Sequence, residues 1–172
     1  MKALPVILAF AASTALIAGP AAVQVNPPYA APEIEGTDQE GKTVKFAEVY
    51  KANPFVVVYF YPKADTPGCT KQGCSLRDGH EDLTKLGVKV IGVSHDSVAE
   101  EKAFSDKFKF PFTLIADKDG KVIEAFKVKQ MPNGMASREA FLIKNGKVVW
   151  HDPKASTDQQ AEDIKKAIQE VK

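Results

Sequence analysis

The chain has two cysteines, Cys69 and Cys74, and the thiol is a side chain suited to nucleophilic and redox chemistry. Cys69 follows a short Thr-Pro-Gly loop, which comes soon after a run of β-branched and aromatic residues at 55–61. Residues 70–86 contain few helix breakers, so Cys69 is expected in the first turn of a helix. Free backbone N–H groups and the positive end of the helix dipole favour an anion there. Because the thiolate is the nucleophilic form of cysteine, this position predicts a reactive Cys69.

The spacing of the two cysteines decides whether they can form a permanent disulfide. Residues five apart in one helix lie about 140° apart around its axis and about 7.5 Å along it. The Cα atoms of a disulfide lie within about 7 Å, so an intact helix keeps Cys69 and Cys74 apart. Gly73 lies between them and weakens a helix by about 0.5–1 kcal/mol relative to alanine. The pair is therefore predicted to switch between thiols and disulfide, and a static structural disulfide is the alternative.

The elements that must position the cysteines alternate along the chain. Residues 55–61 form a continuous apolar run, which is typical of a strand buried on both faces of a sheet. Further strands are expected at residues 43–46, 88–93 and 112–115, and a hairpin at 140–150 around Asn145-Gly146. Further helices are expected after capping boxes at Ser97-x-x-Glu100 and Thr157-x-x-Gln160. This order predicts an α/β thioredoxin-like fold, with a central mixed β-sheet flanked by helices.

The N-terminal segment has a composition of its own. One positive charge at Lys2 precedes an almost wholly apolar run at residues 4–17, and small residues follow up to Ala22. Residues 1–22 are therefore predicted to be a signal peptide, and the protein is expected in the periplasm or another extracytoplasmic compartment. The run is shorter than the roughly 20 apolar residues of a membrane span, so no stable membrane association is expected after cleavage. An uncleaved anchor is the alternative.

The composition of the rest excludes several classes of protein. The chain has 172 residues, of which 44% are apolar and 26% charged, as expected for one globular domain. That domain is expected over residues 31–172, after an extended leader rich in alanine and proline. The net charge of +1 argues against a nucleic-acid partner. The three histidines lack metal-ligand spacing and no phosphate-binding loop occurs, so neither a metal nor a cofactor is expected.

The loop before Cys69 carries a resemblance to a known family. The pattern Pro62-x-x-x-Thr66-x-x-Cys69 resembles the peroxidatic motif of the peroxiredoxins. Residues 59–78 resemble the bacterioferritin-comigratory, or Q-type, branch, and the similarity extends from about Ala31 to the C-terminus. The resemblance implies a thiol-dependent peroxidase that reduces hydrogen peroxide and organic hydroperoxides. It also implies recycling by a thioredoxin-like dithiol reductant.

The resemblance implies a role for each matching residue. Cys69 would be the peroxidatic nucleophile that becomes a sulfenic acid, and Cys74 would be the resolving cysteine. Thr66 would hydrogen-bond the thiolate or the peroxide, and Pro62 would shield the site from water. Of the two arginines in the chain, Arg138 lies just before an expected strand, where the family places an arginine beside the thiolate. A guanidinium there would stabilise the thiolate and the leaving oxygen.

Two other functions are compatible with a thioredoxin-like fold. The first is an exported thiol–disulfide oxidoreductase, whose usual mark is a C-x-x-C pair, whereas four residues separate the cysteines here. The second is a non-enzymatic copper chaperone that uses the cysteine pair and a remote histidine such as His151, because copper(I) prefers thiolate ligands. The Pro-x-x-x-Thr-x-x-Cys pattern favours the peroxidase over both.

Overall fold

A central mixed sheet organises the computed structural model, which describes residues 22–171 of the chain. Its six strands, in chain order, are β1 (Val23–Ala30), β4 (Phe55–Phe60), β5 (Val88–Ser94), β6 (Thr113–Ala116), β7 (Glu139–Lys144) and β8 (Lys147–Asp152). Their order across the sheet is β1-β8-β7-β4-β5-β6. β4 pairs in parallel with β5 and antiparallel with β7, so β4 lies in the middle. The predicted thioredoxin-like α/β fold is confirmed.

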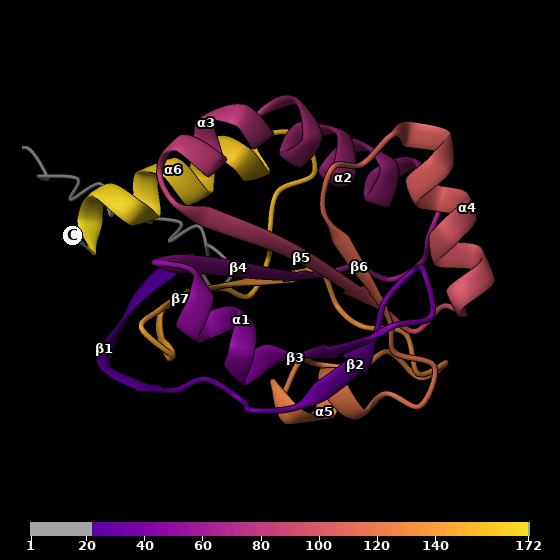
Figure 1. Cartoon of the computed structure of the whole chain (residues 1–172), viewed down its shortest axis with the longest axis horizontal. Helices are drawn as coiled ribbons and strands as arrows, with labels where there is room; N and C mark the ends of the chain where they lie inside the picture. The colour runs from indigo at the N-terminus through magenta and orange to yellow at the C-terminus, as the bar shows by residue number, and fades with distance from the viewer. Residues whose placement is uncertain (1–21, 172) are drawn as a thin grey trace, which may run out of the picture.

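Helices cover both faces of the sheet (Figure 1). One face carries α2 (Pro67–Asp78), α3 (His80–Lys85), α4 (Val98–Phe108) and α6 (Gln160–Glu170). The other face carries α1 (Phe46–Ala52) and α5 (Lys121–Ala125), beside a two-stranded ribbon of β2 (Glu35–Thr37) and β3 (Thr43–Lys45). No helix within residues 22–171 is long and apolar enough to cross a membrane.

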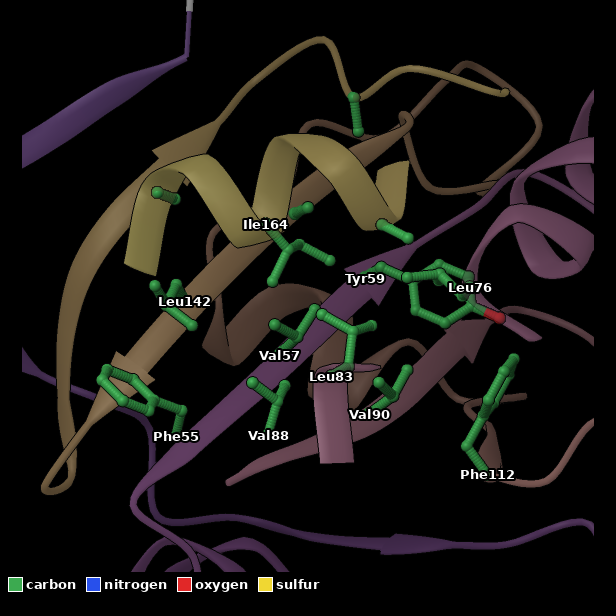
Figure 2. Close-up of a cluster of buried hydrophobic side chains, with 14 of the residues drawn as sticks. Phe55, Val57, Tyr59, Leu76, Leu83, Val88, Val90, Phe112, Leu142 and Ile164 are labelled. Carbon is green, nitrogen blue, oxygen red and sulfur yellow. The ribbon is translucent and has the colours of Figure 1, made fainter. Parts of the chain in front are cut away.

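The central strand β4 contributes to the hydrophobic core on both faces. Val57 and Tyr59 belong to the cluster under α2, α3 and α6, where Figure 2 shows them with Leu76, Leu83 and Ile164. Val56, Val58 and Phe60 belong to the cluster on the opposite face. All six residues of β4 are buried, because successive side chains of a strand point to opposite faces and both faces are covered. The strand predicted from this apolar run is confirmed.

The single helix expected at residues 70–86 is instead two helices, which meet at Gly79. A Cβ atom on Gly79 would lie 2.6 Å from the Cβ of Ala161, so the missing side chain lets α6 pack against the break. The capping box at Ser97 is present, whereas the one expected at Thr157 is not formed. Helix α6 begins at Gln160 without a side-chain cap, and the Gln160 side chain turns inward instead.

The segment expected to be an extended leader forms an edge strand. β1 pairs antiparallel with β8, from Val23 opposite His151 to Ala30 opposite Lys147, with an irregularity between Gln24 and Tyr29. The predicted signal peptide over residues 1–22 lies, apart from Ala22, outside the described residues.

Candidate active site

The start of α2 places Cys69 at the carboxyl edge of the sheet. Thr66 is the N-cap residue and Pro67 is the first helical residue, a position where proline is favoured because no N–H partner is needed. Cys69 is therefore the third residue of α2, in the first turn, where free N–H groups favour an anion. Its side chain is buried, at 2% exposure, beneath the end of β4. The sequence-based placement of Cys69 at a helix start agrees with this geometry.

Arg138 reaches the Cys69 sulfur from the residue that precedes β7. Its Nη2 donates to Sγ of Cys69 at 3.4 Å, and its Nη1 donates to Oε1 of Gln72 at 2.5 Å. A Cβ atom on Gly68 would lie 3.1 Å from Nη2, so a glycine here leaves room for the guanidinium. The structure therefore brings together two residues that are 69 positions apart in the chain. The other arginine, Arg77, binds the carbonyl of Phe108 away from this contact.

Cys74 lies in the same helix as Cys69, half-buried against the same core cluster. Both cysteines are free. The intact helix keeps them apart, in agreement with the spacing argument, so the structure represents the dithiol state. Gly73 packs directly on Phe110, because a Cβ atom there would lie 2.5 Å from the ring. Helix propensity alone predicts that alanine at position 73 would stiffen α2, whereas this contact puts the Phe110 ring where the methyl group would lie.

Thr66 and Pro62 lie in the loop that joins β4 to α2. Thr66 Oγ1 donates to the carbonyl of Lys63 at 2.9 Å. A hydroxyl carries one hydrogen, so Thr66 cannot also donate to the thiolate in this state and retains only its acceptor lone pairs. Pro62 is half-buried directly after Tyr61.

A buried polar network anchors this loop to the end of β5 and to α4. The carboxylate of Asp96 accepts from the backbone N–H of Ala64 at 2.7 Å and pairs with Lys63 at 3.0 Å. Ser94 Oγ contacts the carboxyl groups of both Asp96 and Glu101. Because one hydroxyl hydrogen cannot serve two carboxylates, a proton on Glu101 completes the network. Burial raises the pKa of Glu101 to about 7, in agreement with this arrangement.

Three buried polar residues at the site were not identified from the sequence. Gln72 links Arg138 to Gln160, because its Nε2 donates to Gln160 Oε1 at 2.8 Å. The hydroxyl of Tyr59 has no hydrogen-bond partner among the described residues. Burial raises the pKa of Tyr59 well above its usual value, and the charges of Glu101 and Cys69 raise it further. Gln72 follows Cys69 by three residues and so shares its helix face, which is the one sequence signal that could have indicated it.

The copper-chaperone alternative needs a histidine beside the cysteines. His151 stacks on Phe141, with ring centroids 4.3 Å apart, and its Nε2 lies 2.8 Å from Oε2 of Glu139. Phe141 belongs to the core cluster on the opposite face of the sheet from Cys69. The structure therefore does not bring His151 to the cysteines. Within residues 22–171, no three or more His, Cys, Asp or Glu side chains are grouped so that they could hold a metal ion.

Comparison with known proteins places the chain in a family. Residues 28–151 match the AhpC/TSA family. Peroxiredoxin Q, chloroplastic, from Triticum aestivum is 40% identical over 142 residues, which cover 82% of this chain and 63% of the relative. The protein of the same name from Sedum lineare is 46% identical over 113 residues, which cover 64% of this chain and 60% of the relative. The chain thus spans about 60% of the length of these curated relatives.

A solved structure extends the match to three dimensions. The bacterioferritin comigratory protein of Xanthomonas campestris is 30% identical and superposes with a TM-score of 0.73, covering 80% of this chain and 91% of that one. Fold, cysteine position and relatives all define a peroxiredoxin. The chain belongs to the AhpC/TSA family, and its relatives place it in the Q-type branch. The family predicted from the residues around Cys69 is confirmed.

The expectation of an exported, periplasmic protein is wrong. The relatives from Triticum aestivum and Sedum lineare are both named as chloroplastic proteins. The expectation was drawn from an apolar run near the N-terminus. Such a run describes local composition and does not by itself specify a compartment.

Proposed function

We propose that this protein is a thiol peroxidase in which Cys69 attacks hydrogen peroxide or an organic hydroperoxide. The observation that carries this proposal is the contact between Arg138 Nη2 and Cys69 Sγ at the start of α2. The guanidinium and the helix N-terminus both favour the thiolate, and the guanidinium can stabilise negative charge on the leaving oxygen. The Xanthomonas campestris relative has alkyl peroxide reduction activity, which supports including organic hydroperoxides as substrates.

The first half of the proposed cycle oxidises Cys69. The thiolate attacks one peroxide oxygen, the O–O bond breaks, and the sulfur becomes a sulfenic acid. The other oxygen takes up a proton and leaves as water or as an alcohol. Thr66 Oγ1, whose hydrogen is given to Lys63, serves as an acceptor for the peroxide hydroxyl. Pro62 limits the access of water from the adjoining loop.

The second half of the proposed cycle returns the sulfur to its starting state. The Cys74 sulfur attacks the sulfenic sulfur, water leaves, and an intramolecular disulfide forms. Because an intact α2 keeps the two cysteines apart, this step requires the helix to unwind between them. A thioredoxin-like dithiol then reduces the disulfide by exchange and is itself oxidised to a disulfide.

Peroxide consumption and intact-mass measurement together test the proposal. The reduced protein with a dithiol reductant should consume peroxide catalytically. Without the reductant it should consume one equivalent and lose two hydrogens in mass as the disulfide forms. A parallel titration with copper(I) tests the chaperone alternative. Tight copper(I) binding without peroxide consumption would overturn the proposal.

A further inference from the structure

Gln160, the first residue of α6, is a glutamine with no solvent exposure, 88 positions from its partner in α2. Its Oε1 accepts from Nε2 of Gln72, which is also fully buried. Next to it, the backbone N–H of Ala161 donates to Ser75 Oγ at 3.3 Å, which gives α6 a second polar contact with α2. The first turn of α6 is therefore attached to the helix that carries both cysteines.

Arg138 determines the direction of the two hydrogen bonds that connect it through Gln72 to Gln160. A guanidinium can only donate, so its contact with Gln72 requires the Gln72 oxygen to face it. The Gln72 amide nitrogen must then face α6, and Gln160 must present its own oxygen. The Gln160 nitrogen consequently has no hydrogen-bond partner within the described residues. A buried N–H group without a partner is destabilising. The Gln160 amide therefore has this orientation because Arg138 fixes the Gln72 amide, and not because Gln160 itself prefers it.

We propose that Gln160 is a positioning residue for Arg138 and that it holds the guanidinium on the Cys69 sulfur through the Gln72 amide. The inference rests on the proposed function, because Arg138 matters only if Cys69 reacts as a thiolate. The two hydrogen bonds from Arg138 to Gln72 and from Gln72 to Gln160 form a relay. Gln72 lies between the two cysteines on α2, so the relay is complete only while the helix is intact. Unwinding of α2 for disulfide formation withdraws Gln72 and releases Arg138 from Gln160. The contact that favours the thiolate is thereby coupled to the helical state.

The pH profile of Cys69 alkylation tests this coupling without any peroxide. Iodoacetamide reacts with the thiolate, and mass spectrometry of the Cys69 peptide follows this sulfur separately from Cys74. Gln160→Met keeps the side-chain volume and removes the acceptor. We expect its alkylation profile to move to higher pH and its rate at pH 6 to fall about three- to tenfold. The second-order rate constant for the first peroxide reaction should fall by the same factor.

The matched control is Gln159→Met, the same change at the exposed neighbour, which should leave the profile in place. Gln72→Met removes the middle of the relay, should reproduce the shift, and serves if Gln160→Met does not fold. The double variant should shift no further than Gln72→Met alone, because both changes remove the same interaction. A lower melting temperature with an unchanged alkylation profile in both single variants would overturn the proposal. If the wild-type protein does not consume peroxide, the proposed function fails, while the alkylation profile still tests the relay.

Discussion

The two faces of the sheet share the same strands but differ in their buried polar groups. On the face of α1 and α5 the cluster is aliphatic and aromatic, and a buried carboxylate at its margin, Asp117, accepts from two backbone N–H groups of α5. On the face of α2 and α6 the apolar packing includes both cysteines and two glutamines. The two unpartnered buried side-chain atoms of the described residues, in Tyr59 and Gln160, also lie here. One face is almost wholly apolar, and the other buries two polar atoms without partners beside α2, the helix that the proposed cycle unwinds.

On the face of α2 and α6, the largest effects should come from replacing the two sulfurs. Cys69→Ser should abolish peroxide consumption, because an alcohol at this position is not a thiolate. Cys74→Ser should consume one equivalent of peroxide and then stop as a sulfenic acid, since the first step does not need the resolving sulfur. Stopped-flow kinetics and trapping of the sulfenic acid measure both outcomes. A first turnover that survives in Cys69→Ser and is lost in Cys74→Ser would reverse the two roles.

The next largest effect should come from the guanidinium beside Cys69. Arg138→Met removes a fixed donor to the reacting atoms, and such a loss typically lowers a rate by about 10²–10³-fold. The unfolding free energy should change much less, because Arg138 is only partly buried. Single-turnover peroxide kinetics and denaturant unfolding separate the two quantities. A rate within threefold of the wild type would remove Arg138 from the mechanism.

The opposite face should respond in the reverse way. Phe141 is 2% exposed and packs against Phe60, Phe126 and His151. Phe141→Ala should lower the free energy of unfolding by about 3–5 kcal/mol, through lost transfer energy and the cavity that remains. The rate constant of Cys69 with peroxide should stay within twofold for the folded fraction. A large rate defect in a folded Phe141→Ala protein would show that the faces are not separable.

A smaller effect concerns the buried carboxyl group of Glu101, which lies in the polar network that anchors the loop before Cys69. Burial raises the pKa of Glu101 in the folded protein to about 7, from its usual value of about 4.5, so the folded state binds more protons between these values. Stability should therefore be greatest below about pH 4.5 with respect to this group and fall as the pH rises to about 7. The difference is up to about 3 kcal/mol. Glu101→Gln should flatten this part of the profile. Denaturant unfolding between pH 4.5 and 8 tests both, and parallel profiles would contradict the assignment.

The smallest effect tests the contact under Gly73. Gly73→Ala places a methyl group against the Phe110 ring and should destabilise the folded protein by about 1–3 kcal/mol. Phe110→Leu removes the ring edge, so Gly73→Ala should be less harmful in that background. Denaturant unfolding of the two single variants and the double variant gives the coupling energy. Additive effects would mean that Phe110 is not the obstacle.

Local patterns predicted much of the fold, and contacts distant in sequence account for the misses. The β4 strand, the Ser97 capping box and the Asn145-Gly146 hairpin follow from signals a few residues long, and all are present. The helix break at Gly79 depends on Ala161, which no local pattern near Gly79 can indicate.

In the candidate site, too, the residues of the local motif and its family resemblance could be predicted, whereas those that depend on contacts between distant helices could not. The family resemblance of the motif before Cys69 predicted an arginine beside this sulfur, and the structure brings Nη2 of Arg138 within 3.4 Å of Sγ of Cys69. The glutamine relay could not be predicted, because it requires α6 to lie against α2. Gly73 shows the same limit in energetic terms, since helix propensity predicts a gain from alanine while Phe110 imposes a clash.

Strand β4 belongs to both faces, and this restricts how the chain can vary over evolutionary time. Val57 and Tyr59 line the cysteine face, while Val56 and Val58 line the other. The loss or gain of one residue within the strand would exchange the two sets and shift Cys69 relative to Arg138. A single substitution along β4 leaves this alternation intact, whereas the length of the strand should stay constant in homologous chains that keep Cys69 beside Arg138.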